Sequence, residues 1–332
     1  MTHFGKYQNT SLLREALNRG EIEKPYVAIV DNALDYNSID EPNYRKMPLT
    51  FEITGNGNIV WKAKEDTTSP KTIEYSKDKG TTWTSITSTT GGTSIPVVSG
   101  DTVQFRGDNQ NYGAYIEPEY YYYSTFSGST AQFKVKGNIM SLINSTNFST
   151  LTTLSTAYTF FNLFNGCTGL TDASNLILPA TTLAEGCYLA MFSGCKSLTT
   201  APSVLPATIL TERCYAQMFY GCTNLTQAPE LPATTLAQEC YNWMFIKCTS
   251  LTTAPELPAT TLAENCYLEM FRRCSNLNYI KCLATDISAF NCTYNWVGNV
   301  ASSGTFVKAA SMNDWTTDDN GIPSGWTVQD AS

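Results

Sequence analysis

The chain has 332 residues, more than the roughly 100 to 200 residues of a typical single core, so we expect at least two structural units. Only 15% of the residues are charged and the net charge is −8, which leaves no broad basic surface and excludes nucleic acid as an expected partner. No stretch approaches the roughly 20 apolar residues of a membrane helix, and the first residues lack the apolar core of a signal peptide. We therefore expect neither membrane insertion nor export by the signal-peptide route.

Residues 1–46 are predicted to form a separate N-terminal segment. Leu12, Leu13, Ala16 and Leu17 share one stripe of a short helix over residues 10–19, with Gly20 where that helix would stop. Residues 25–32, PYVAIVDN, are typical of a strand.

Residues 47–141 change to a period of two. Alternating apolar and polar runs flank a Gly-Asn-Gly turn at 55–57 and an Asp-Lys-Gly turn at 78–80, and two further runs follow at 100–107 and 130–137. This pattern predicts a small antiparallel β-sandwich.

Residues 142–282 repeat with a period of about 26. Aligned units give columns of identical apolar residues, which we expect to be buried between neighbouring units. Tyr, Met and Phe at spacings of three and four indicate one face of a short helix in each unit, after a strand and a proline-marked bend. The columns are Phe164, Phe192, Phe219, Phe245 and Phe271; Leu170, Leu198, Leu225, Leu251 and Leu277; Tyr188, Tyr215, Tyr241 and Tyr267; and Met191, Met218, Met244 and Met270.

All 11 cysteines lie after residue 166, and eight of them recur at the repeat period. A disulfide or metal framework is one interpretation, but no two cysteines have the close spacing of a zinc site and the single histidine, His3, is far away in sequence. We favour a column of small buried thiols.

The recurring Leu-Thr-x-Ala-Pro-x-Leu-Pro-Ala followed by Cys-Tyr-x-x-Met-Phe-x-x-Cys resembles the BspA-like leucine-rich repeats, which occur in surface proteins of gut anaerobes and in proteins of their phages. The matches span about 158–282, and residues 304–328 resemble the closing segment of such arrays, so residues 283–332 are predicted to form a C-terminal cap. The resemblance implies a mixed α and β fold: an N-terminal helix and small antiparallel β-sandwich followed by a leucine-rich-repeat solenoid. The N-terminal segment, with its predicted helix and the sequence KPYVAIVDN, resembles the attachment segment of phage structural proteins more than the N-terminal region of the bacterial surface proteins.

Candidate binding residues are the aromatic and basic side chains at variable positions. Tyr120, Tyr121, Tyr122 and Tyr123 form a row in a predicted strand, where alternate rings would be exposed to stack on sugars or on another subunit. Trp243, Arg272 and Arg273 occupy variable slots of the repeat and are candidates for partner contact. The alternative for the tyrosine row is a strand merely rich in tyrosine, and the alternative for Trp243, Arg272 and Arg273 is ordinary surface variation.

No catalytic constellation is evident in the sequence. A histidine base is missing from the repeats, no phosphate-binding loop occurs, and the adjacent pair Asp318 and Asp319 is expected to be an exposed turn. We expect no enzyme activity, no cofactor and no bound metal.

The sequence thus favours a phage virion structural protein, a head or tail fibre or appendage that binds other virion proteins through its N-terminal segment. Its repeats would present a surface to a host glycan or protein, and oligomerisation is expected. Two alternatives remain open: a bacterial cell-surface adhesin without its signal peptide, and an enzyme acting on polysaccharide.

Overall fold

The computed structural model describes residues 29–30, 33–34, 43–64, 69–116 and 120–331. The helix predicted over residues 10–19 lies outside these ranges. Of the strand predicted over 25–32, only β1 (Ile29–Val30) is described, and it pairs antiparallel with β2 (Ala33–Leu34). Among the residues that the structure describes, three 3-10 helices follow: η2 (Tyr44–Lys46), η3 (Ile139–Leu142) and η4 (Phe148–Thr150).

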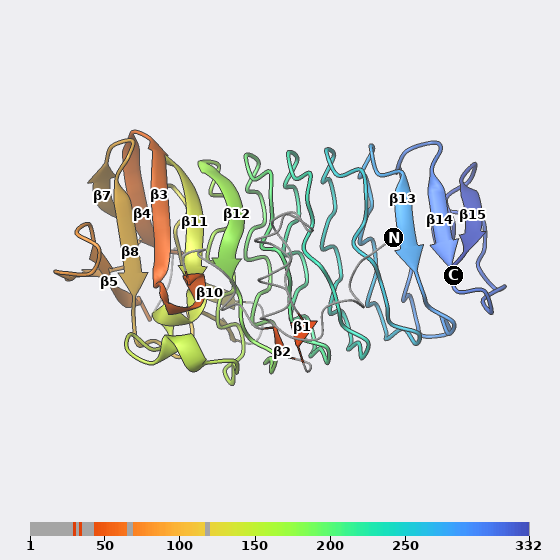
Figure 1. Cartoon of the computed structure of the whole chain (residues 1–332), viewed down its shortest axis with the longest axis horizontal. Helices are drawn as coiled ribbons and strands as arrows, with labels where there is room; N and C mark the ends of the chain where they lie inside the picture. The colour runs from red at the N-terminus through yellow and green to blue at the C-terminus, as the bar shows by residue number, and fades with distance from the viewer. Residues whose placement is uncertain (1–28, 31–32, 35–42, 65–68, 117–119, 332) are drawn as a thin grey trace, which may run out of the picture.

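Two larger sheets form the N-terminal part of the molecule (Figure 1). The six-stranded sheet has the order β12-β11-β3-β8-β5-β6 and the four-stranded sheet has the order β7-β4-β10-β9. The strands of the first are β3 (Leu49–Gly55), β5 (Thr72–Ser76), β6 (Thr84–Thr87), β8 (Thr102–Arg106), β11 (Gln132–Asn138) and β12 (Leu170–Ile177). Those of the second are β4 (Gly57–Ala63), β7 (Thr93–Val97), β9 (Gly113–Ile116) and β10 (Tyr120–Thr125).

Aromatic rings fill the space between the two sheets. Phe51 of β3 lies 4.9 Å from Phe126, which in turn lies 4.8 Å from Trp61 of β4, measured between ring centroids. All three side chains are fully buried. The alternation seen in the sequence therefore places one face of each strand in this shared core.

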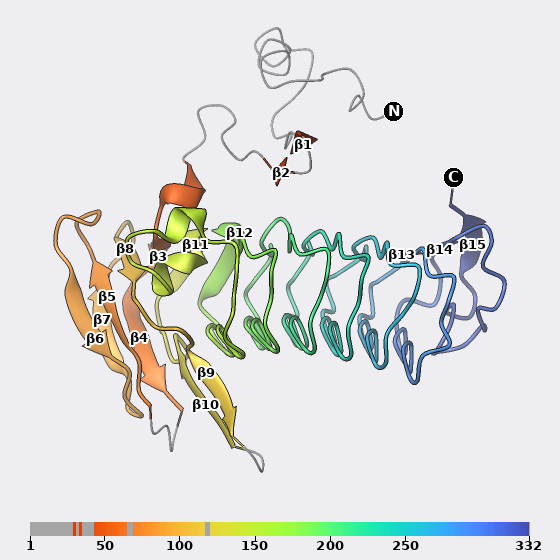
Figure 2. The same cartoon turned by 90° about the horizontal axis from the view of Figure 1, so that it is seen from below.

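The six-stranded sheet leads directly into the repeats. Four of its five strand pairs are antiparallel, and the pair of β11 with β12 is parallel. Strand β12 already belongs to the first repeat. Figures 1 and 2 show the following units lying side by side in chain order beyond β12. A single hydrophobic cluster extends from Leu49 to Trp326, so the repeats share one core with the N-terminal sheets.

Each repeat unit contains a run of tight turns where the sequence predicted a helix. In the unit around Met191, one amide bonds within the unit and the next bonds to the neighbouring unit: Met191 N donates to Tyr188 O (3.2 Å) and Phe192 N donates to Met218 O (2.9 Å). Every fourth residue has a left-handed backbone, as at Gly186, Ala190 and Gly194 (φ 54°, 51° and 71°). An α-helix tolerates neither feature.

The predicted mixed α and β fold with a leucine-rich-repeat solenoid is therefore wrong. The described residues are nearly all β, in several separate sheets, and their longest helix is the four-residue η3. Apolar spacings of three and four arose from turns of period four, not from a helix. In the three units that begin at Leu198, Leu225 and Leu251, the predicted strand is reduced to isolated bridges such as Thr200 with Gln227, since two prolines in each of these units remove backbone donors.

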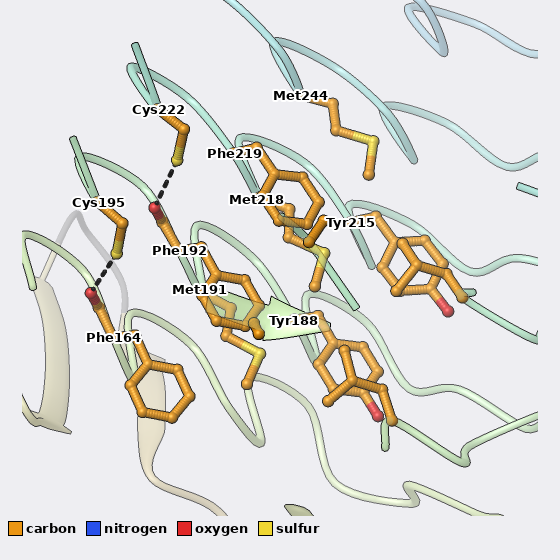
Figure 3. Close-up of a cluster of buried hydrophobic side chains, with 14 of the residues drawn as sticks. Phe164, Tyr188, Met191, Phe192, Cys195, Tyr215, Met218, Phe219, Cys222 and Met244 are labelled. Carbon is orange, nitrogen blue, oxygen red and sulfur yellow. Dashed lines mark hydrogen bonds between the residues drawn. The ribbon is translucent and has the colours of Figure 1, made fainter. Parts of the chain in front are cut away.

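The predicted burial of the four apolar columns is confirmed, because every column member is at most 2% exposed. The phenylalanine rings stack at 5.3 to 5.6 Å from Phe164 through Phe271, and the tyrosine rings stack at 5.6 to 6.1 Å from Tyr188 through Tyr267 (Figure 3). The phenylalanine column begins at Phe126, directly after β10, and the tyrosine column begins at Tyr112, directly before β9. Both columns end against Trp296.

The cysteines are buried free thiols, as the sequence predicted. Four of them bond the backbone of the preceding unit: Cys195 Sγ donates to Phe164 O at 3.0 Å, and Cys222 Sγ donates to Phe192 O at 3.1 Å (Figure 3). Cys248 and Cys274 repeat this contact with Phe219 and Phe245. A thiol thus serves as both a small apolar filler and a donor between units.

The last units are closed by a parallel sheet of β13 (Tyr279–Cys282), β14 (Thr305–Lys308) and β15 (Thr327–Asp330). Trp315 stacks on Trp296 at 5.6 Å, and Phe306 packs edge-on against both rings. The segment predicted as a C-terminal cap therefore covers the final rings of the core.

Gly221 can be used to measure the free-energy cost of placing a residue with a Cβ in the left-handed conformation of these turns. Its φ is 71°, and a Cβ added there would meet no atom within 4 Å. We expect Gly221→Ala to lower the free energy of unfolding by about 1 kcal/mol, because only the backbone conformation is penalised. In urea unfolding, Gly91→Ala is the matched control: its Cβ would also enter open space, but without a positive φ, and it should be neutral or slightly stabilising. Equal values for the two variants would contradict this account.

Candidate groove between the tyrosine hairpin and the repeats

The β9–β10 hairpin projects on the side where the turn segments of the repeats gather (Figure 2). Tyr121 and Tyr115 are paired across the two strands, and their rings lie 4.8 Å apart. Tyr121 also lies 5.0 Å from Phe161 of the first repeat, and Tyr123 lies 5.4 Å from the same ring. The hairpin is thus fixed against the repeats through its tyrosines.

A groove with a volume of about 510 Å³ runs between this hairpin and the repeats. Tyr115 and Tyr121 form its hairpin wall. The repeats supply the opposite wall from three successive units, which present apolar, amide and charged side chains: Leu189, Arg213, Ala216, Gln217, Glu239, Asn242 and Trp243. Trp243 is 37% exposed, so its ring remains accessible in the groove.

The charged groups of the groove are paired with each other. Arg213 Nε donates to Glu239 Oε2 at 2.7 Å, and this bond raises the pKa of the guanidinium above its usual range. Burial raises the pKa of the Tyr121 phenol, so that ring stays neutral at physiological pH. The Oδ1 atom of Asn242 is buried without a hydrogen-bond partner among the described residues. The groove therefore combines aromatic faces with amide groups and an ion pair.

A second hollow of about 300 Å³ adjoins the groove and shares Trp243 with it. Its other lining residues are Tyr220, Ile246, Lys247, Glu269, Arg272 and Arg273. Arg272 Nη1 bonds both carboxylate oxygens of Glu269 at 2.9 Å.

The structure brings some of the sequence-derived candidates together and separates others. Tyr121 and Trp243 line one groove, and Trp243 lines the adjoining hollow with Arg272 and Arg273. Tyr123 faces Phe161 and Tyr122 points to the other side of the strand, so neither lines the groove. The side chain of Tyr120 lies outside the described residues.

Several groove residues were not predicted as sites. Arg213 and Glu239 lie one repeat period apart, and opposite charges at that separation predict an ion pair between neighbouring units; this signal was available in the sequence. Tyr115 had no comparable signal, because its place depends on how the hairpin packs on the repeats.

The remaining candidates for chemistry are a metal site, the acidic pair near the C-terminus and the single histidine. No group of three or more His, Cys, Asp or Glu side chains in the described ranges is arranged to hold a metal ion. Asp318 accepts hydrogen bonds from Thr316 and Asn320 in an exposed turn, as predicted. His3 lies outside the described residues.

No family model, curated protein or solved structure matches this chain. No helix within the described ranges is both long and apolar enough to span a membrane.

Proposed function

We propose that this chain is a non-enzymatic recognition protein whose groove binds a glycan chain of a cell surface. The observation that carries this proposal is the meeting of Tyr121 and Trp243, which are 122 residues apart in sequence, in one groove. Aromatic faces pack against the apolar C–H faces of sugar rings, and the amide of Gln217 can bond sugar hydroxyls.

The state of the acidic groups supports binding over catalysis. Glycosidases need a carboxylic acid and a carboxylate free to exchange protons. Glu239 and Glu269 are the acids that line the groove and the adjoining hollow, and each is held by an arginine at 2.7 to 2.9 Å. Both acids are therefore engaged in ion pairs within the protein.

The setting of this activity is a separate part of the proposal. Placement in a phage virion, attachment to other virion proteins through residues 1–46 and assembly as an oligomer are supported by the sequence resemblance described above. Glycan binding by the groove does not depend on this placement, and it would work equally on a virion or on a bacterial cell surface.

Glycan binding is tested with an array of microbial and host polysaccharides, followed by titration of any that bind. We expect Trp243→Ala to weaken binding at least about tenfold, since a central exposed aromatic commonly contributes more than about 1.4 kcal/mol to an interface. Phe290→Ala is the matched control, because Phe290 lies just beyond the repeats, where its carbonyl accepts from Asn265 N, and is 69% exposed but does not line the groove. Absence of any glycan ligand, or release of sugar from one, would contradict the proposal.

A further inference from the structure

The basic residues of the repeats are concentrated in one place. Residues 142–282 contain six lysines and arginines, and three of them, Lys247, Arg272 and Arg273, line the hollow next to the groove. In a chain of net charge −8, such clustering creates a local positive field against an acidic background.

Only one of these three cations is neutralised by a carboxylate. Glu269 pairs with Arg272, whose Nε atom is nevertheless buried without a hydrogen-bond partner. The Lys247 ammonium donates to the Tyr220 hydroxyl at 3.1 Å and lies 5.3 Å from the centre of that ring. No carboxylate of the described chain lies within 4 Å of Lys247 or Arg273. The hollow therefore keeps two uncompensated positive charges beside aromatic walls.

We infer that this hollow is a subsite for the carboxylate of an acidic sugar, a uronic or sialic acid within the same glycan chain that occupies the groove. Trp243 is a wall of both spaces, so one residue of a glycan packed on that ring has its neighbour beside the cations. Arg273 is exposed and can approach a carboxylate with two parallel N–H donors. The inference rests on the proposed glycan function and specifies the charge of the ligand.

The test uses the full chain and a panel of carboxylated polysaccharides: polygalacturonate, alginate, hyaluronan and polysialic acid, each paired with its carboxyl-reduced form. We expect at least one acidic member to bind about tenfold or more tightly than its reduced partner at low salt, and to lose that advantage as salt rises. Arg273→Gln should remove most of the preference for the acidic form. Lys196→Gln is the matched control, since Lys196 is an exposed cation of the same repeats outside the hollow.

The outcomes separate the two proposals. Equal binding of acidic and reduced forms, or an acidic preference that survives Arg273→Gln, overturns the carboxylate subsite and leaves glycan recognition standing. Absence of binding to every glycan, acidic and neutral, overturns both. Binding of poly-glutamate as tightly as the acidic glycan, lost in Arg273→Gln, would show a subsite for acidic peptides and also overturns the inference.

Discussion

The protein is expected to unfold cooperatively between about pH 9 and pH 11 in the presence of a reductant. Burial raises the pKa of all eleven thiols, for example that of Cys222 and that of Cys274 to about 12. An unfolded thiol has a pKa of about 8.5. Between these two values the unfolded chain releases protons that the folded chain retains.

The sign of the effect follows from that difference. Below pH 8 the thiols are protonated in both states, so the stability is fully present. Above the unfolded pKa each thiol lowers the free energy of unfolding by up to about 1.4 kcal/mol per pH unit, and eleven together reach on the order of 15 kcal/mol per unit. Since a domain has a total stability of roughly 5 to 15 kcal/mol, about one to two pH units suffice to unfold it.

The measurement is circular dichroism against pH, with alkylation of the thiols by iodoacetamide, which reacts with the thiolate, followed on the same samples. Loss of structure and ionisation of the thiols should coincide, because the thiols can ionise only in the unfolded chain. A folded protein at pH 11, or thiols that titrate near pH 8.5 while the structure persists, would contradict their burial.

Leu251→Ala is expected to lower the free energy of unfolding by about 2 to 5 kcal/mol, because Leu251 is completely buried between repeat units and its truncation leaves a cavity. Thr249 is a poor control, since its hydroxyl donates to Thr223 O at 3.1 Å and its loss would itself cost about 1 kcal/mol. Thr252→Ala is the better control because Thr252 is exposed. Urea denaturation of the three proteins measures the difference, and similar midpoints for Leu251→Ala and Thr252→Ala would refute the column assignment.

The buried columns could be predicted from the sequence because a 26-residue repeat places identical residues at equivalent positions of neighbouring units. The backbone between them could not be predicted from apolar spacing, because turns of period four and an α-helix both bring residues three and four apart onto one side. A distinguishing signal was present: Asn291, Asn295 and Asn299 lie four apart, and all have a left-handed backbone (φ 50°, 49° and 62°). Asparagine and glycine favour that conformation, and their recurrence at every fourth residue argues against a helix.

The candidate groove was only partly foreseen for a different reason. Trp243 stands out because it occupies a variable slot of the repeat, and Tyr121 because it lies in a row of tyrosines. Their proximity depends on the β9–β10 hairpin packing against Phe161, a tertiary contact that neither local pattern encodes. Pairings within the repeats can be read one period apart, whereas pairings between the hairpin and the repeats require the fold.

The convergence of both aromatic columns on Trp296 determines how proteins of this design can change in length. A new unit inserted between Phe219 and Phe245 would lengthen both columns by one ring and leave each end covered by the same partners. Trp296 contacts the last ring of both columns, and Trp315 stacks on Trp296. A unit added after Trp296 would therefore need one ring for each column in place of the single indole, and a new contact for Trp315. Longer or shorter relatives should therefore differ by whole internal units, and the surface formed by their turn segments should grow or shrink in the same fixed increments.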